Sequence, residues 1–139
     1  MKKFYLFFIF LIFSALQSGA DQFVPEFSTM RVIRCDVNET IYNQDNSVVS
    51  KTQYHRIFRL DDPNKKIYLG KAPVDWLLEY ENDKIRFIQQ PLADDYMMTS
   101  NVILNRMDNT YTAKTEITYD NPAFASRHAE ASGICKPVE

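Results

Sequence analysis

Hydrophobic and polar residues alternate along most of the chain beyond residue 20, in short runs separated by clusters of asparagine and aspartate. A period of two is typical of β-strands with one buried face, and no longer window carries the stripe of an amphipathic helix. In the first run, Ile33, Cys35 and Val37 alternate with polar residues. Cys35 is therefore expected on the inward face of a strand over residues 29–42, and the pattern predicts an all-β fold.

Turn residues mark the ends of the further strands. The second run places Tyr54, Phe58 and Leu60 on one face and His55 on the other. It stops at Pro63, which has no N–H to donate to a neighbouring strand. The remaining runs predict a short strand over residues 66–69, a hairpin over 76–90, a loop over 91–95, a second hairpin over 97–119 and a final strand over 129–136.

The first hairpin has the clearest alternation. It places Trp76, Leu78 and Tyr80 on one face of its first strand, and Ile85 and Phe87 on one face of its second strand. Cross-strand pairs of aromatic and β-branched side chains each contribute a few tenths to about 1 kcal/mol. We therefore expect these two sets of side chains to pack together across the hairpin.

About eight strands with hairpin connections predict a small antiparallel barrel or sandwich. If the cysteines near the two ends pair, the first and last strands are neighbours, as in a closed or nearly closed sheet. Only Gly70 and Gly133 remain beyond residue 20, which is few for the tight corners of a closed barrel, so both architectures stay open. In the second hairpin, Asp108 and Asn109 can take the turn conformation that glycine would otherwise supply. Residues 123–128 are the one stretch whose pattern allows a helical turn.

The first 20 residues have the layout of a removable export signal. Two lysines precede an apolar core from Phe4 to Leu16, and small residues fill positions 18–20. The core is shorter than the roughly 20 residues that span a bilayer. We expect cleavage after Ala20, a single β domain over residues 21–139, and an exported location, either periplasmic or extracellular. Neither cysteine directly follows the cleavage site, where residue 21 is aspartate, so no lipid anchor is expected.

The two cysteines of this domain, Cys35 and Cys135, are expected to form a disulfide. An even number of cysteines in an oxidising compartment favours pairing. Such a bond closes a loop of about 100 residues, for which the chain-entropy model gives about 4.7 kcal/mol. The alternative is two free thiols acting as metal ligands or redox groups, although the chain has no C-x-x-C motif and no histidine at ligand spacing.

The charge of the chain disfavours two classes of partner. Its 16 lysines and arginines are outnumbered by 18 aspartates and glutamates, and loss of the two signal lysines makes the balance more acidic. Nucleic-acid-binding proteins and surface-bound amphipathic helices usually carry a basic face. Beyond the signal, no basic run is longer than Lys65 and Lys66. We therefore expect no nucleic-acid partner and no stable membrane insertion after signal cleavage.

The sequence carries no recognisable catalytic, cofactor-binding or metal-binding motif. It lacks both the G-x-S-x-G motif of serine hydrolases and a glycine-rich phosphate loop. His55 and His128 are its only histidines, and neither has carboxylates at the spacing of a catalytic or metal site. The acidic pairs at 61–62 and 94–95 fit turns in which the side chains cap the backbone, and neither continues into a calcium loop. We therefore expect a non-enzymatic protein without a cofactor.

Most of the aromatic residues are expected in the core, because β folds bury aromatics on their inner faces. Protein interfaces also favour tyrosine and methionine. Tyr96, Met97 and Met98 follow the predicted loop over residues 91–95. These three residues are therefore the candidate interaction surface.

Several segments resemble small exported bacterial β-proteins of undescribed function. They are the export signal, the cysteine of the first strand, the Phe-Arg-Leu-Asp strand end at 58–61, the Leu-Asn-Arg segment at 104–106 and the Gly-Ile-Cys segment at 133–135. The layout is also similar to periplasmic lysozyme-inhibitor-like and lipocalin-like β-barrels. The Gly-x-Trp motif of lipocalin-like carriers is missing and no loop motif of the inhibitors is matched, so the resemblance assigns no site residues.

These observations favour a non-enzymatic exported binding protein, whose disulfide-tied β-scaffold presents loops to a protein, a glycan or an envelope component. The alternative is a lipocalin-like carrier of a hydrophobic small molecule, which requires a sizeable apolar cavity behind Trp76, Phe58 and Phe87. A solidly packed core would exclude the carrier. An enzyme with an unrecognised site is a third hypothesis, and it predicts turnover that is sensitive to substitution of His55 or His128.

Overall fold

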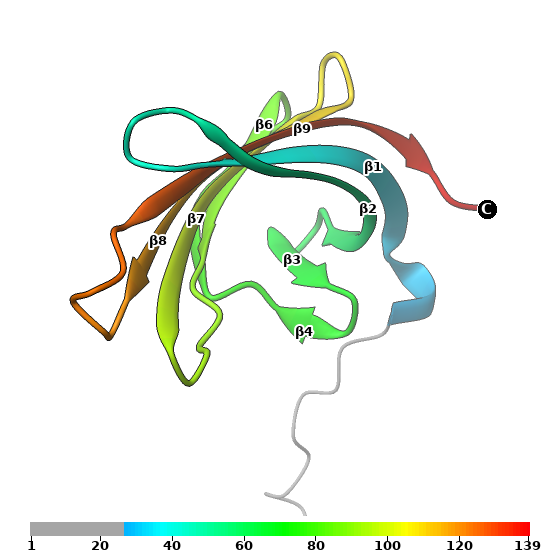
Figure 1. The fold of residues 1–139 in the computed structure, drawn as a ribbon. Helices are drawn as coiled ribbons and strands as arrows, with labels where there is room; N and C mark the ends of the chain where they lie inside the picture. The colour runs from blue at the N-terminus through cyan, green and yellow to red at the C-terminus, as the bar shows by residue number, and fades with distance from the viewer. Residues whose placement is uncertain (1–26) are drawn as a thin grey trace, which may run out of the picture.

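The computed structural model describes residues 27–139, so the predicted export signal lies outside the described residues. The fold is all-β, as predicted, and its antiparallel strands form one sheet that curls into a half-barrel (Figure 1). A short 3-10 helix, η1 (Phe27–Thr29), precedes the first strand. The sheet has nine strands, and its single curled layer is closer to the barrel alternative than to a sandwich of two sheets.

The strand order around the sheet is β4-β3-β2-β1-β9-β8-β7-β6-β5. Chain-consecutive strands are therefore neighbours, except that β1 pairs with β9 and that β4 and β5 form the two edges. The bounds are β1 (Arg31–Tyr42), β2 (Val48–Asp61), β3 (Lys66–Leu69), β4 (Ala72–Pro73), β5 (Trp76–Tyr80), β6 (Lys84–Gln89), β7 (Tyr96–Asn105), β8 (Thr110–Tyr119) and β9 (Arg127–Pro137).

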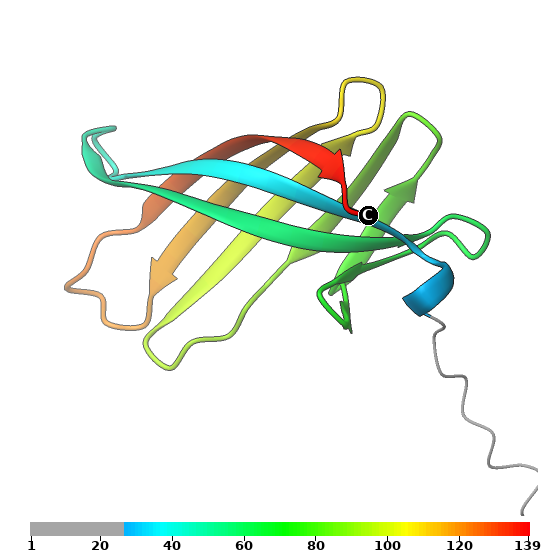
Figure 2. The same ribbon diagram turned by 90° about the vertical axis from the view of Figure 1, so that its right-hand side faces the viewer.

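The first and last strands are joined by a disulfide. Cys35 on β1 lies directly opposite Cys135 on β9, both are buried, and their Cα atoms are 3.9 Å apart. The N–H of Val138 also donates to the carbonyl of Val32 (2.9 Å), so the C-terminal end lies beside β1 (Figure 2). The predicted pairing of the two cysteines is confirmed.

The core lies on the concave face of the sheet. Phe58, Ile85 and Phe87 are at most 1% exposed. The ring of Phe58 packs edge-on against Phe87, with centroids 5.8 Å apart, and stacks with Tyr111 at 6.1 Å. Burial of such large apolar side chains contributes roughly 1.5–3 kcal/mol each. The cluster is completed by Cys35, Val37, Leu60, Ile67, Tyr80, Val102, Leu104, Ala113, Ala131 and Cys135.

Turn residues act largely as predicted. Asn109, between β7 and β8, takes a left-handed conformation (φ 58°), as does Asn46 between β1 and β2 (φ 66°). The stretch at 123–128 differs from the prediction, because it contains no helical turn. A turn instead closes where the N–H of Phe124 donates to the carbonyl of Asn121 (3.1 Å), and β9 begins at Arg127.

The face assignment predicted for β5 is wrong. A bulge after Leu77 shifts the register between β5 and β6, which breaks the strict alternation. Leu77 lies opposite the buried Phe87, whereas Trp76 is 51% exposed. Of the three residues expected to share a face, only Tyr80 is buried, and Trp76 and Leu78 are exposed.

The sheet does not close between its edge strands β4 and β5. Pro73 in the two-residue β4 has no N–H with which to pair a further strand. At one end of this seam, Asp62 accepts hydrogen bonds from the Tyr80 hydroxyl (2.8 Å) and from Arg106 (2.8 Å), and it lies 3.4 Å from Arg31. We call these four polar residues the Asp62 cluster. The cluster links the turn after β2 to β5, to β1 and to the turn between β7 and β8.

Candidate functional site

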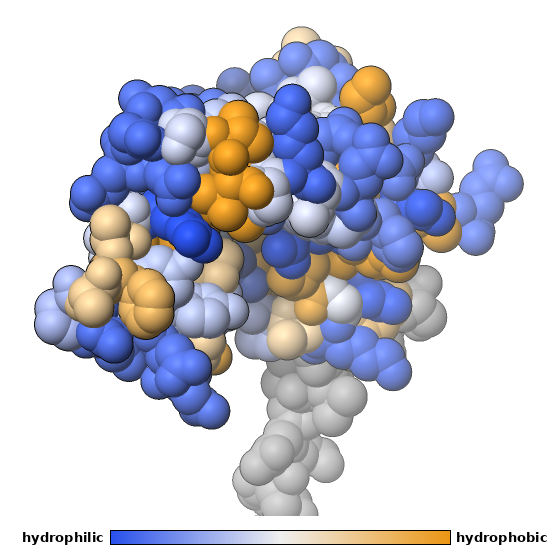
Figure 3. All heavy atoms as spheres, viewed as in Figure 1, coloured by the Kyte–Doolittle hydropathy of each residue, from blue (hydrophilic) through white to orange (hydrophobic). Residues whose placement is uncertain are grey.

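A pocket of about 660 Å³ opens on the concave face beside the packed core. It is lined by residues of β1 to β4 and β6 to β8, and by the segment that precedes β7. The surface is hollowed between the β3–β4 edge and the ends of β7 and β8 (Figure 3). The concave face is therefore filled by side chains at one end of the strands and open at the other.

Short side chains at inward positions explain why the core stops here. Ser100 on β7 and Ala113 and Thr115 on β8 line the back of the pocket. On β9, a Cβ atom at Gly133 would lie 2.1 Å from the backbone oxygen of Asp36 on β1. The two strands therefore approach each other closely at a position that only glycine permits. The short side chains of Ser100, Ala113 and Thr115 leave the space in front of the sheet unfilled.

The apolar part of the lining continues the core. Phe58, Leu69, Phe87 and Val102 belong to it, and their neighbours in the core are buried. An apolar cavity was expected behind Trp76, Phe58 and Phe87, and the structure places only the two phenylalanines at the pocket. Trp76 is not part of the lining because the bulge in β5 leaves it exposed.

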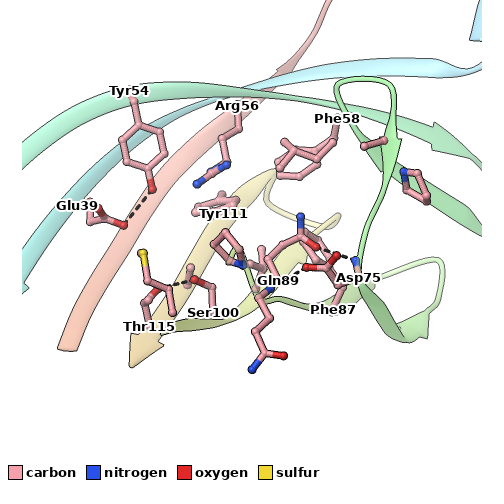
Figure 4. A pocket seen from close by; sticks show the side chains of 18 of the residues that line it. Glu39, Tyr54, Arg56, Phe58, Asp75, Phe87, Gln89, Ser100, Tyr111 and Thr115 are labelled. Atoms are coloured by element: carbon pink, nitrogen blue, oxygen red, sulfur yellow. Dashed lines mark hydrogen bonds between the residues drawn. The ribbon is translucent and has the colours of Figure 1, made fainter. Parts of the chain in front are cut away.

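The polar part of the lining contains two side-chain hydrogen bonds. The Tyr54 hydroxyl donates to the carboxylate of Glu39 (3.1 Å), and the hydroxyls of Ser100 and Thr115 lie 2.7 Å apart. Figure 4 shows Tyr54, Arg56 and Phe58 projecting side by side from β2 into the pocket. The pocket therefore presents hydroxyl, carboxylate and guanidinium groups beside an apolar surface.

Arg56 is the least satisfied of these polar groups. Its Cζ lies 5.0 Å from the centroid of the Tyr54 ring, which is a cation–π distance. Its Nε is shielded from solvent and has no hydrogen-bond partner among residues 27–139. No carboxylate of the described residues forms an ion pair with it. The pocket therefore contains a cation without a matching anion.

The tyrosines around Arg56 stay protonated over a wide pH range. Burial raises the pKa of Tyr54, and the neighbouring Tyr111 and Glu39 raise it further, whereas Arg56 acts in the opposite direction. Burial likewise raises the pKa of Tyr111, and Arg56 again opposes the rise. Both hydroxyls therefore keep their protons at neutral pH and remain hydrogen-bond donors.

The rim of the pocket is held by backbone-to-side-chain hydrogen bonds. The N–H of Asp75 donates to Oε1 of Gln89 (2.7 Å), and the N–H of Gln90 donates to the Asp75 carboxylate (2.7 Å) (Figure 4). Since Asp75 lies between β4 and β5, these bonds tie the connection of the two edge strands to the end of β6.

The candidate interaction surface does not form one continuous face. Met98 lines the concave pocket, and Tyr96 lines a second hollow at the end of β7. Met97 lies between them on the opposite face of the strand and is 44% exposed, and its sulfur accepts a hydrogen bond from Gln90 (3.4 Å). The role of Tyr96, Met97 and Met98 in binding stays a prediction.

The second hollow has a volume of about 640 Å³ and is bordered by a row of aromatic rings. Tyr119 lies between Tyr96 and Phe124, with centroid distances of 6.0 and 5.8 Å, and the guanidinium of Arg127 lies 5.8 Å from its ring. Phe124 is 62% exposed. This hollow lies outside the core, at the connection between β8 and β9.

The residues weighed for catalysis or metal binding have ordinary surroundings. His55 is exposed on the outward face of β2, and His128 stacks on Tyr42 with centroids 5.1 Å apart. Asp61 accepts a hydrogen bond from the Asn64 side chain (2.9 Å) and so supports the turn after β2. In the described part of the chain, no group of three or more His, Cys, Asp or Glu residues is placed to hold a metal ion.

The charged residues of the pocket lining, Arg56 and Glu39, were not predicted from the sequence as site residues. On β2, the side chain of Arg56 lies on the inward face between those of Tyr54 and Phe58. On β1, Glu39 lies on the same inward face as Cys35. Both residues were therefore visible in the sequence as charged side chains at inward positions. Alternation alone does not tell whether such a position faces a filled core or an open pocket.

Comparison of the chain with protein-family models, curated proteins and solved structures finds no match. The function of the pocket must therefore be inferred from its own geometry. Within residues 27–139, no helix is long and apolar enough to cross a membrane.

Proposed function

We propose that this chain is a non-enzymatic exported binding protein that holds a small molecule in its concave pocket. The observation that carries the proposal is the pocket of about 660 Å³ at a place where a β-fold of this size normally packs its core. Pockets for small ligands typically measure about 300–1,000 Å³ and combine an apolar lining with a few polar groups. The geometry therefore favours the carrier hypothesis over a scaffold that only presents loops.

The distribution of polarity in the pocket supports a ligand with an apolar body and a polar group. Phe58, Leu69 and Phe87 offer an apolar surface, while Glu39 and Arg56 offer charged groups. A purely apolar ligand would leave these charged groups desolvated without new partners, which is unfavourable. In this use of the concave face, the protein would be similar to lipocalin-like carriers.

Binding without chemistry fits the side chains that line the pocket. The hydroxyls of Ser100 and Thr115 bond to each other, and His55, which is exposed at the edge of the pocket, forms no hydrogen bond with either hydroxyl within residues 27–139. Activation of a hydroxyl as a nucleophile requires a base within hydrogen-bond reach. The arrangement therefore supports a binding role.

The disulfide supports a location outside the cytoplasm, periplasmic or extracellular. Disulfides form and persist in oxidising compartments, and Cys35 and Cys135 are paired. This agrees with the export signal predicted over residues 1–20.

A second candidate function is recognition of a protein, a glycan or an envelope component at the second hollow. The observation that favours it is the exposed aromatic row formed by Tyr96, Tyr119 and Phe124 next to Arg127. Aromatic and arginine side chains are enriched in interfaces. Loss of partner capture on Phe124→Ser, with small-molecule binding unchanged, would support this candidate.

The small-molecule proposal is tested with a neutral fluorescent probe, N-phenyl-1-naphthylamine. We expect saturable binding to the wild-type protein and at least about tenfold weaker binding to Ser100→Phe, whose ring would fill the back of the pocket. Asn101→Phe is the matched control, because it places the same ring on the opposite face of the same strand.

Native mass spectrometry of the protein purified from its export compartment, before and after organic extraction, provides an independent test. A bound small molecule that is lost on extraction, and lost in Ser100→Phe, supports the proposal. Absence of any co-purifying molecule, together with probe binding that Ser100→Phe leaves unchanged, would overturn it.

A further inference from the structure

We propose that the ligand of the concave pocket is an apolar carboxylate and that Arg56 binds its carboxylate group. The inference rests on the proposed small-molecule function and deepens it, because it names the charge, the chemical class and the orientation of the ligand. It is carried by a guanidinium that projects into the pocket and has no anionic partner among the described residues.

Arg56 has a hydrogen-bond donor that the protein leaves unused. A guanidinium has five N–H donors in a fork that matches a carboxylate. The Nε of Arg56 is shielded from solvent without a hydrogen-bond partner, and buried polar groups in proteins are nearly always paired. Other arginines of the fold are paired, since Arg106 lies 2.8 Å from Asp62 and Arg86 lies 2.8 Å from Glu79. Arg56 therefore has donor capacity directed at the pocket.

Two carboxylates, those of Glu39 and Asp75, line the pocket. Glu39 accepts a hydrogen bond from Tyr54 (3.1 Å), and Asp75 accepts one from the backbone N–H of Gln90 (2.7 Å). Both acidic groups of the lining thus already have partners in the protein. Arg56 interacts with the hydroxyls of Tyr54 and Tyr111 but forms no ion pair, and its Nε has no hydrogen-bond partner within residues 27–139. It therefore offers an unused donor to an anionic group of a ligand.

Two tyrosines, Tyr54 and Tyr111, lie beside Arg56 in the pocket. The ring of Tyr54 packs against its guanidinium, and the ring of Tyr111 lies below it in Figure 4. Both tyrosines keep their hydroxyl protons, as described above, so they add no negative charge beside Arg56, although the proton of Tyr54 is already donated to Glu39. This arrangement suits a planar carboxylate, which accepts several hydrogen bonds at once.

An apolar surface adjoins Arg56 inside the pocket. Phe58, the next inward residue of β2 after Arg56, begins the apolar surface that continues through Leu69 and Phe87. Leu92 lies at the rim and is largely exposed. A carboxylate held at Arg56 would therefore direct an apolar chain or ring along this surface towards the rim.

The test compares two probes that differ only in the polar group, dodecanoate and dodecan-1-ol. Each is titrated against wild-type protein loaded with N-phenyl-1-naphthylamine. We expect dodecanoate to bind at least about tenfold more tightly than the alcohol, because hydrogen bonds to charged groups are stronger than neutral ones. The preference should disappear in Arg56→Met and persist in Arg34→Met, which removes an exposed arginine from the outward face of β1.

The outcomes separate this inference from the proposed function. Equal binding of the acid and the alcohol to the wild type, or a preference that survives in Arg56→Met, would overturn the role of Arg56 while the neutral probe still reports a working pocket. An equal loss of preference in Arg34→Met would also overturn it, because general charge and not Arg56 would then be responsible. Failure of the neutral probe to bind the wild type contradicts the proposed function itself.

A second variant keeps the test valid if Arg56→Met disturbs the pocket. Glu39→Gln retains an oxygen that accepts from Tyr54 but removes the negative charge beside the site. It should strengthen dodecanoate binding severalfold and leave dodecan-1-ol unchanged. An unchanged affinity for the acid would count against the inference.

The melting temperature of Arg56→Met distinguishes ligand binding from a purely structural role. A cation without an anionic partner contributes little to the fold, so its removal should leave the melting temperature unchanged or raise it. Added dodecanoate should raise the melting temperature of the wild type but not of Arg56→Met. A clear decrease on substitution, without a change in ligand preference, would show that Arg56 serves only the structure.

Discussion

The two ends of the concave face are formed by the same strands, yet one is packed and the other is open. At the packed end, β2 and β7 contribute the buried Leu60 and Leu104. At the open end, the same strands contribute Arg56 and Ser100 to the lining of the pocket. The register of the paired strands runs through both ends without interruption from Arg31 to Ile41 on β1 and along the whole of β7. The difference between the two ends therefore lies in the side chains.

The comparison separates the part of the sheet that stabilises the fold from the part that we propose binds a ligand. Apolar burial contributes roughly 25 cal/mol per Å², and the packed end, with the disulfide beside it, collects most of the buried apolar residues. The open end contains polar and charged groups that add little to the stability of the fold. Since one continuous sheet carries both ends, the packed end holds the open end in shape.

The largest expected effect comes from removing the disulfide at the packed end. Replacement of Cys35 and Cys135 by alanine should lower the free energy of unfolding by about 4 kcal/mol, because the unfolded chain regains the entropy of a long loop. The measurement is denaturant unfolding monitored by tryptophan fluorescence. Probe affinity per folded molecule should stay close to that of the wild type. Unchanged stability would show that pairing of β1 with β9 alone holds these strands together.

A single truncation at each end of β7 tests the comparison directly. Leu104→Ala at the packed end should lower the free energy of unfolding by about 3 kcal/mol, because it leaves a cavity in a buried cluster. Met98→Ala at the open end should cost less than about 1 kcal/mol, because Met98 borders the open pocket and a neighbouring side chain or solvent can replace it. Equal losses would mean that the open end is as important for folding as the packed end.

Acid should weaken the packed end through the Asp62 cluster. Partial burial disfavours the charged form of Asp62, but the hydrogen bonds from Tyr80 and Arg106 outweigh it, so the pKa of Asp62 lies below its ordinary value of 3.8. Ionised Asp62 therefore stabilises the fold at neutral pH, and this stabilisation is lost as the pH falls below about 4 and through the folded pKa.

The check is the melting temperature as a function of pH for Asp62→Asn. The variant should melt below the wild type at neutral pH and should lose less on acidification between about pH 5 and pH 3. Asp94→Asn, in the exposed segment before β7, is the control and should follow the wild type. If Asp62→Asn also follows the wild type at every pH, the cluster does not contribute to holding the seam.

Much of the fold could be predicted because strand formation depends on local patterns. The alternation of Ile33, Cys35 and Val37 located β1 and its buried face, and the short β3 was predicted with its observed bounds. Asparagine in a left-handed turn and proline at an edge act through their own backbone chemistry. The disulfide followed from compartment and cysteine count, and it required the first and last strands to be neighbours.

The errors and omissions concern properties that no local pattern contains. The bulge after Leu77 exposed Trp76, and a bulge is an inserted residue that simple alternation does not reveal. Tyr96, Met97 and Met98 were chosen as a candidate surface because interfaces favour tyrosine and methionine and because the three residues follow the loop over 91–95. Its distribution over two hollows became visible only in the folded sheet.

The sequence by itself determined which residues form strands, where the chain turns, which side of most strands is buried and which cysteines can pair, because these depend on side-chain period and backbone chemistry. Only the tertiary structure decided how far the sheet curls, because curl results from the twist and pairing of all the strands together. It also decided that Arg56 and Glu39 face a pocket and not a filled core. That outcome depends on short side chains such as Ser100, on another strand and far along the sequence, which leave the facing space open.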